Sequence, residues 1–272
     1  MKNCVRTILI VLSVIVLSSC DGYEKLLKSA DYDAQYKAAV EYYQQGRYTK
    51  ARQLFENLQV HFRNKEQSEN IAWYYCNTLY KSGSYALAAY NFSTFNRKYP
   101  YSTYAEDALF LSAYCKYLDA PSYSLDQSIS KDAIKDFEYF ADRYPQSTRI
   151  PEVNACLDKL QSQLERKDFE IAMGYFRTEN YHAAYVSLKN FLNLYPHSQY
   201  REEAMFTILR SGYQYAANSQ ESKMKERLQS VINDFENYVA TFTDPKYVST
   251  SQTIYNKTKA LLAQIEEQEN KK

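Results

Sequence analysis

A spacing of apolar residues recurs three times along the chain and predicts amphipathic helices that end abruptly. Each copy has a small residue, a large apolar residue four positions later, another three positions after that, and a proline five positions further on. The copies are Ala88-x3-Phe92-x2-Phe95-x4-Pro100, Ala133-x3-Phe137-x2-Phe140-x4-Pro145 and Ala184-x3-Leu188-x2-Phe191-x4-Pro196. Positions i, i+4 and i+7 share one face of a helix, and proline prevents the helix from continuing. Three copies in one chain indicate a repeat protein.

A second helical pattern comes before each copy, so each repeat is predicted to be a pair of antiparallel helices joined by a turn. In the first two repeats, residues 33–64 and 68–102, the turn contains Gly46 or Gly83, and these glycines are 37 residues apart. Glycine takes the left-handed backbone conformation without steric cost, which suits a tight turn after a helix. In the fourth repeat we expect Asn180 to take the place of the glycine.

The later repeats vary this plan. The third has a long connection from Leu118 to about Lys131, and the fourth begins with a long helix or a broken pair over about 151–177. The fifth is degenerate and lacks the closing proline. We predict an all-α fold, an α-solenoid of about five helix-turn-helix repeats over 33–245, followed by a C-terminal capping helix and a polar tail over 246–272.

Composition supports a folded helical protein that binds other proteins. Charged residues make up 24% of the chain and hydrophobic residues 45%, and only 5 Gly and 6 Pro argue against a turn-rich all-β fold. The 29 Tyr combine an apolar ring with a polar tip, which suits both packing between helices and protein-binding surfaces. A net charge of +1 without a basic cluster gives no reason to expect a nucleic-acid partner.

The first twenty residues have the pattern of an export signal. Lys2 and Arg6 form a short positive start, and residues 8–17 form an apolar stretch that is too short to span a bilayer. A spanning helix needs about 20 apolar residues. Leu17-Ser-Ser-Cys20 then resembles a bacterial lipobox, in which the cysteine is acylated and becomes the first residue after cleavage.

We therefore predict a lipoprotein signal peptide over 1–19, lipidation with palmitate-type acyl chains on Cys20, and a lipidated tether over 20–32. Several acyl chains on one residue give stable membrane anchoring. The alternative is a plain secretory signal with an incidental cysteine. From 33 Lys and Arg against 32 Asp and Glu, cleavage removes Lys2 and Arg6 and leaves a net charge of about −1.

The repeat period, the Gly-x-Tyr-x2-Ala turn and the closing proline resemble tetratricopeptide repeats. A narrower resemblance comes from a Tyr-Pro-x-Ser phrase that opens the next repeat, at Tyr99–Ser102, Tyr144–Ser147 and Tyr195–Ser198. Together with the lipobox, the size and the long connection in the third repeat, this phrase is similar to the BamD family, the tetratricopeptide lipoproteins of the outer-membrane β-barrel assembly machine. The many tyrosines and the longer C-terminal segment depart from that family.

The resemblance implies a scaffold that is anchored to the outer membrane by its N-terminal lipid and faces the periplasm. In that family the C-terminal repeats dock the periplasmic domains of the BamA-like barrel insertase, and the N-terminal groove contacts unfolded β-barrel precursors. From helical spacing, the groove should be lined by residues on the first helix of each repeat that lie off the packed stripe. These positions are Tyr36, Val40 and Tyr43 in repeat one, Asn70, Trp73, Asn77 and Tyr80 in repeat two, and Leu109, Ala113 and Lys116 in repeat three. Trp73 is either a partner anchor or a side chain that packs on the neighbouring repeat.

Nothing in the sequence points to catalysis, a cofactor or a metal. His61, His182 and His197 are far apart, no C-x-x-C pair occurs, and no metalloprotease, nucleophile-elbow, P-loop or dinucleotide motif is present. We expect the remaining cysteines to be small buried helix residues: Cys76, Cys115 and Cys156. Two other binding functions stay open, a peptidoglycan- or Tol-associated envelope adaptor and a glycan-binding outer-membrane lipoprotein.

Overall fold

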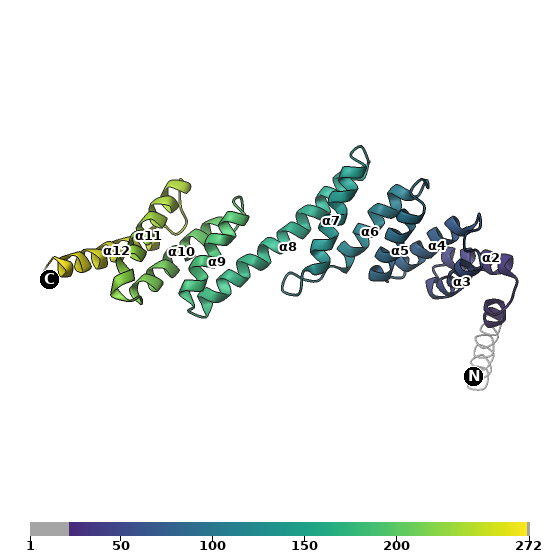
Figure 1. The fold of residues 1–272 in the computed structure, drawn as a ribbon, viewed down its shortest axis with the longest axis horizontal. Coiled ribbons are helices and arrows are strands. Elements are labelled where there is room, and N and C mark those ends of the chain that lie inside the picture. The colour runs from purple at the N-terminus through teal and green to yellow at the C-terminus, as the bar shows by residue number, and fades with distance from the viewer. Residues whose placement is uncertain (1–21, 271–272) are drawn as a thin grey trace, which may run out of the picture. The chain divides into compact units, whose positions relative to one another are not determined.

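The computed structural model describes residues 22–270, and this part of the chain consists of helices joined by turns, without a strand (Figure 1). The main helices are α2 (Tyr32–Gln44), α3 (Tyr48–His61), α4 (Ser68–Lys81), α5 (Tyr85–Lys98), α6 (Ala105–Asp119), α7 (Ser128–Arg143), α8 (Ile150–Arg177), α9 (Tyr181–Leu194), α10 (Arg201–Ala217), α11 (Glu221–Thr241) and α12 (Val248–Glu269). The predicted all-α fold of paired helices is confirmed. The predicted signal peptide and the lipidated Cys20 lie outside the described residues.

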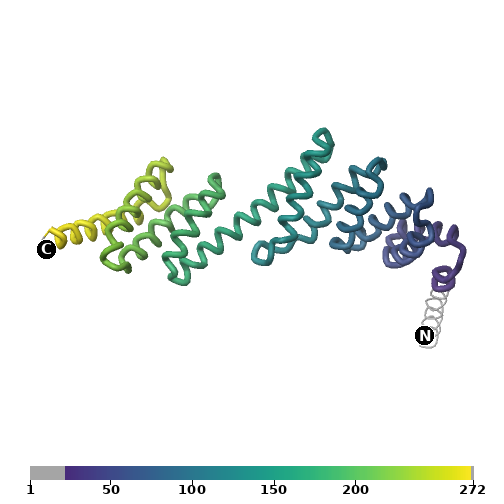
Figure 2. Tube along the Cα trace, viewed as in Figure 1, coloured from purple at the N-terminus to yellow at the C-terminus, as the bar shows by residue number. Residues whose placement is uncertain are grey.

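The chain divides into two compact units. Unit 1 consists of residues 1–121 and 125–160, and its description begins at residue 22. Unit 2 consists of residues 122–124 and 161–272, and its description ends at residue 270. Within each unit the chain runs through helices that pack against their neighbours in sequence (Figure 2). This nearest-neighbour packing is the hallmark of a helical repeat array.

The repeated apolar stripes form the cores of both units. Phe92 and Phe137 of unit 1 and Leu188 of unit 2 are fully buried, with 0% of their surface exposed. Each occupies the second position of the stripe, so the prediction that these side chains lie in the seams between helices is confirmed. Full burial of one such side chain stabilises the fold by about 1.5–3 kcal/mol.

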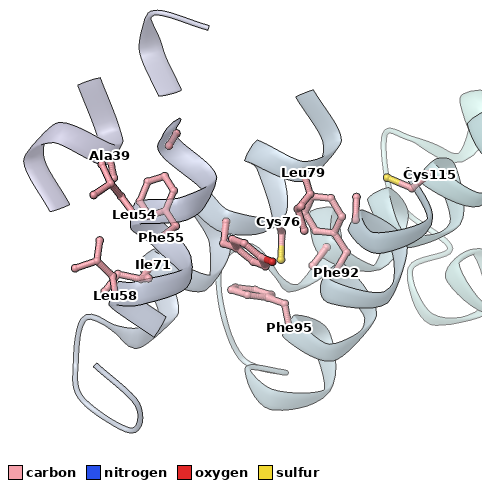
Figure 3. Close-up of a cluster of buried hydrophobic side chains, with 14 of the residues drawn as sticks. Ala39, Leu54, Phe55, Leu58, Ile71, Cys76, Leu79, Phe92, Phe95 and Cys115 are labelled. Carbon is pink, nitrogen blue, oxygen red and sulfur yellow. The ribbon is translucent and has the colours of Figure 1, made fainter. Parts of the chain in front are cut away.

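The core of the first two repeats shows how the seams are filled (Figure 3). Phe55 and Leu58 of α3 belong to the same buried cluster as Ile71 and Leu79 of α4 and Phe92 of α5. One hydrophobic cluster therefore continues through the first two repeats and reaches Ala108 and Cys115 of α6.

The turns follow the glycine prediction in the first two repeats and correct it in the fourth. Gly46 and Gly83 have φ angles of 73° and 75°, in the left-handed region. In the fourth repeat Glu179 takes this conformation, with φ of 60°, and not Asn180. The side-chain oxygen of Asn180 instead accepts a hydrogen bond from the backbone N–H of Ala183 and caps α9. Asparagine is a preferred residue at that capping position, which explains the one-residue displacement.

Three segments add detail to the prediction. Helix α8 is unbroken from Ile150 to Arg177, so the alternative of a broken pair is excluded. The connection in the third repeat is shorter than expected, because α6 continues to Asp119 and α7 begins at Ser128. Residues 22–27, within the predicted tether, form a helical turn that packs on the first repeat. The predicted capping helix appears as α12.

Candidate partner-binding surface

The Tyr-Pro-x-Ser phrase forms a hydrogen-bonded clamp between consecutive repeats. In each copy the serine hydroxyl donates to a glutamate on a first helix, and the serine oxygen accepts the backbone N–H two residues further on. The hydroxyl donors and carboxylate acceptors are Ser102 and Glu69 (2.7 Å), Ser147 and Glu106 (2.5 Å), and Ser198 and Glu165 (2.5 Å). The matching N–H groups belong to Tyr104, Arg149 and Tyr200. Hydrogen bonds to a charged acceptor are stronger than neutral ones, so the clamp fixes how one repeat meets the next.

Each clamp also includes a stacked pair. The side chain two residues after the serine covers an aromatic ring four residues after the glutamate. Tyr104 stacks on Trp73 with 4.5 Å between ring centroids, Tyr200 stacks on Phe169 at 4.5 Å, and the Arg149 guanidinium lies 4.4 Å from the Phe110 ring centroid. A fourth, variant clamp joins Glu202 to the backbone N–H of Lys246 and stacks Phe206 on Tyr247. Glu-x3-aromatic is therefore a second repeated motif, which the sequence analysis missed.

The clamp establishes which residues of unit 1 are equivalent between repeats. Glu69 and Trp73 correspond to Glu106 and Phe110, a displacement of 37 residues. The same displacement between Gly46 and Gly83 is the sequence signal that identifies this register. It relates three sets of positions on the first helices: Tyr36, Trp73 and Phe110; Val40, Asn77 and Tyr114; and Tyr43, Tyr80 and Tyr117.

This register corrects the groove positions predicted for the third repeat. Leu109 and Ala113 are buried in the core, with 8% and 0% of their surface exposed, so neither can contact a partner. Lys116 turns toward the second helix of its own repeat, where its Nζ lies 2.8 Å from Asp136 Oδ2. A displacement of 36 residues instead of 37 rotates each position by about 100° on its helix. The equivalent residues are Phe110, Tyr114 and Tyr117.

The corrected positions and their neighbours place half-buried tyrosines along α2, α4 and α6, which we call the tyrosine strip. Its members are Tyr36, Tyr43, Tyr74, Tyr80, Tyr114 and Tyr117. Tyr74 of α4 connects the strip to α2, because its ring meets the Tyr43 ring edge-on with 5.5 Å between centroids. Tyr114 and Tyr117 stack at 5.6 Å on α6. The strip thus gathers predicted residues (Tyr36, Tyr43 and Tyr80) with three that the prediction missed.

The remaining predicted residues border the strip in different ways. Asn70 is exposed, and Val40 is half-buried against the first core cluster. The Asn77 side-chain amide donates to the Trp73 carbonyl oxygen at 2.9 Å, so it is engaged within its own helix. The Trp73 indole is committed to Tyr104 and to the rings of Phe92 and Phe95. Trp73 therefore packs on α5 of its own repeat and on Tyr104, where the next repeat begins, and its role as a partner anchor stays a prediction.

Partial burial favours the protonated form of four phenol groups of the strip, those of Tyr36, Tyr43, Tyr80 and Tyr114. Burial raises the pKa of Tyr36, and Tyr74 and Tyr104 raise it further. Burial also raises the pKa of Tyr114, and the next largest effect comes from Tyr80. At neutral pH these hydroxyls can both donate and accept hydrogen bonds beside an apolar ring.

Charged groups lie at the α8 end of the strip. The pKa of Lys159 is raised by a hydrogen bond with Tyr117, and its Nζ lies 5.4 Å from the centre of that ring. Burial raises the pKa of Tyr80 and Tyr114, and the negative charge of Glu152 adds a smaller effect in the same direction on both. The α8 end of the strip therefore carries one cation, Lys159, and one carboxylate, Glu152, which lies 3.8 Å from the Arg149 guanidinium.

Unit 2 presents a different surface at equivalent positions of its first helices. Phe176 and Tyr213 follow Phe169 and Phe206 by seven residues, as Tyr80 follows Trp73. With residues of α12 they line a hollow of about 250 Å³. The Arg210 guanidinium lies 4.5 Å from the Phe176 ring centroid, and Lys257 also lines the hollow. Arg210 over aromatic rings, together with Lys257, gives this surface a positive and aromatic character.

Paired helices in nearest-neighbour contact, with a recurring clamp between consecutive repeats, define a tetratricopeptide-type scaffold for protein interactions. The chain belongs to the YfiO family of outer membrane lipoproteins, whose family model matches residues 29–226. That family and this fold are of a non-catalytic scaffold type. None of the described helices is long and apolar enough to cross a membrane.

Comparison with solved structures finds the TPR2AB domain–pHSP90 complex of yeast Sti1, which is 10% identical with a TM-score of 0.38. The match covers 84% of this chain and 98% of that chain. A comparison with curated proteins found no match.

Proposed function

We propose that this protein is a lipid-anchored periplasmic scaffold of the outer-membrane β-barrel assembly complex. Unit 1 contacts unfolded barrel precursors through the tyrosine strip, and unit 2 docks the periplasmic domains of the barrel insertase. Membership of an outer membrane lipoprotein family supports the location. The observation that carries the proposal is the tyrosine strip, a row of half-buried phenols across three successive first helices.

The chemistry of a barrel precursor matches this strip. Strands of outer-membrane barrels alternate apolar and polar residues and carry girdles of aromatic side chains. An unfolded strand therefore offers aromatic rings together with unpaired backbone N–H and C=O groups. The phenols of the strip supply ring faces for the former and hydroxyl donors and acceptors for the latter. Rings held against the repeat core lose little side-chain freedom on binding, which favours affinity.

The docking role of unit 2 is supported by its different surface. The hollow lined by Phe176, Arg210 and Lys257 is cationic and aromatic. Arginine and aromatic residues are enriched where protein–protein interfaces concentrate their binding energy. Two surfaces of different chemistry allow one chain to hold a folded partner and an unfolded one.

Site-specific photo-crosslinking tests the proposal. A photoreactive phenylalanine analogue is placed at Tyr80 in the strip, and at Tyr139 of α7 as a control. Tyr139 belongs to the same unit and is 55% exposed, but it lies on a second helix. We expect adducts with newly exported barrel precursors from position 80 and few from position 139. Equal yields from both positions, or adducts without barrel precursors, would contradict the proposal.

A further inference from the structure

The helical turn at 22–27 is held firmly on the first repeat at its N-terminal end. Tyr23 is 6% exposed, and its hydroxyl oxygen lies 2.9 Å from the Lys50 carbonyl oxygen and 2.8 Å from Gln53 Oε1. The Tyr23 ring also meets Tyr42 of α2 edge-on, with 5.6 Å between centroids. The turn therefore begins beside the turn that joins α2 to α3.

The other end of the same segment is held by side-chain amides. Gln35 is fully buried, and its amide nitrogen donates to the carbonyl oxygens of Leu26 (3.1 Å) and Ser29 (2.9 Å). The Asn57 amide donates to the Leu27 carbonyl oxygen at 3.0 Å. These bonds tie the carbonyl groups at the end of the helical turn to side chains of the first repeat. From Tyr23 onward, the predicted tether is part of the folded repeat.

This packing limits the distance between the lipid and the folded protein. Cys20, the predicted lipidation site, precedes Gly22 by two residues. Consecutive Cα atoms are about 3.8 Å apart, so the Cα atom of Cys20 lies within about 7.6 Å of that of Gly22. A lipidated Cys20 therefore brings the turn between α2 and α3 to the level of the lipid headgroups.

The surface at this end has the composition of a membrane interface. Lys50 Nζ lies 4.8 Å from the Tyr23 ring centroid and 5.4 Å from the Tyr42 ring centroid, and the Arg47 guanidinium lies 5.9 Å from the Tyr42 centroid. Among the described residues, neither Arg47 nor Lys50 has a carboxylate oxygen within 4.0 Å. Tyrosine rings and long basic side chains are the residues that settle at headgroup depth.

The acidic groups nearby are engaged elsewhere. Glu24 pairs with Lys28 at 3.6 Å, and Glu41 Oε1 accepts a hydrogen bond from the Gln45 side-chain amide at 2.9 Å. Neither carboxylate neutralises the cations of the turn directly. The charge left at this end therefore favours an anionic partner at short range.

We propose that the first repeat docks directly on the bilayer, with Arg47 and Lys50 bound to lipid phosphate groups and the rings of Tyr23 and Tyr42 at headgroup depth. The occupant is the membrane that holds the lipid anchor, because the chain between Cys20 and the packed turn is too short to admit another protein. Unit 1 then leaves the membrane in a fixed direction. This inference rests on the lipid anchor of the proposed function.

Headgroup quenching in proteoliposomes tests the proposal with full-length lipidated protein. The vesicles contain phosphatidylethanolamine, phosphatidylglycerol and a lipid with a nitroxide on its headgroup. A thiol-reactive fluorophore is attached at Thr49→Cys, beside Arg47, or at Tyr101→Cys, in the turn between α5 and α6. Tyr101 is 99% exposed, and the described native cysteines are buried, so labelling is specific.

We expect at least threefold stronger quenching at position 49 than at position 101. Arg47→Glu with Lys50→Glu should reduce quenching at position 49 severalfold, since each basic residue near an anionic surface contributes about fivefold in binding. Ten Gly and Ser residues inserted before Gly22 should weaken the difference between positions, while flotation with the vesicles stays unchanged. Helical content by circular dichroism controls for folding.

Two failures are distinguishable. Protein that floats with the vesicles but is quenched equally at both positions, or is insensitive to the two charge reversals, overturns direct docking and leaves the scaffold proposal intact. Protein that does not float at all refutes the lipid anchor, and with it both the docking and the anchored scaffold.

Discussion

Replacing Phe137 by alanine should destabilise unit 1 strongly, because this ring fills the seam between α6 and α7. Phe137 is fully buried, and its centroid lies 6.2 Å from that of Phe110 and 6.4 Å from that of Tyr117. Phe-to-Ala changes in packed cores cost about 3–5 kcal/mol, from lost transfer energy and the cavity that remains. A domain is stable by only about 5–15 kcal/mol, so the loss is a large share of the total. Because Phe110 belongs to a clamp, the cavity should also loosen the contact with the next repeat.

Urea denaturation followed by circular dichroism measures this effect. With an m-value of about 2 kcal/mol/M, the midpoint of the transition that reports on unit 1 should fall by about 1.5–2.5 M. Tyr139→Ala on the same helix is the matched control, since Tyr139 is 55% exposed. Its free energy of unfolding should change by at most about 0.5 kcal/mol. If the two variants shift the midpoint equally, or if Phe137→Ala shifts it by less than about 0.5 M, the burial of this stripe is refuted.

Three further predictions follow from local features. Glu179→Gly should stabilise unit 2 by about 1 kcal/mol in thermal unfolding, because glycine removes the strain of a left-handed residue, whereas Gly83→Ala should destabilise unit 1 by a similar amount; the same sign for both would contradict the turn assignment. Burial raises the pKa of Cys76 well above its usual value and that of Cys115 to about 12. Both thiols should therefore resist maleimide at pH 8 and react only in urea. Rapid labelling of the native protein would refute this prediction. Burial raises the pKa of Tyr23 to about 12, so its contribution to stability should be complete below pH 10 and lost as the pH rises toward 12; Tyr23→Phe should remove one late-ionising phenol from the absorbance titration at 295 nm, and an unchanged titration would count against that burial.

The helices and the core were predictable because the apolar stripe residues recur with helical spacing in the sequence itself. Ala88, Phe92 and Phe95 specify a helix face, and Pro100 specifies where the chain must leave it. Such patterns need no knowledge of distant partners. The error at Glu179 arose because asparagine suits both a left-handed position and a helix cap, and only the contact with Ala183 separates the two roles.

The partner surface was less predictable because helix positions one residue apart face different directions. Counting from the apolar stripe placed Leu109 and Lys116 in the groove, whereas the clamp between Ser147 and Glu106 shows that the register is one residue later. The Glu-x3-aromatic motif was present in the sequence, but its structural role depends on contacts with the Tyr-Pro-x-Ser turn, which is distant along the chain. The packing of residues 22–27 was missed for a similar reason. It depends on hydrogen bonds from the Gln35 amide to the carbonyl groups of Leu26 and Ser29, and no local sequence pattern predicts these bonds.

Crosslinked purification from cell envelopes tests the central claim most directly. The full-length lipidated protein carries a C-terminal tag, the envelopes are crosslinked and solubilised, and the partners are identified by mass spectrometry. We predict recovery of the barrel insertase together with unfolded barrel precursors, and a parallel fall in outer-membrane barrel proteins when the protein is depleted. Recovery of Tol proteins, peptidoglycan-bound proteins or a nutrient transporter in place of the insertase, with barrel levels unchanged, would contradict the proposed function.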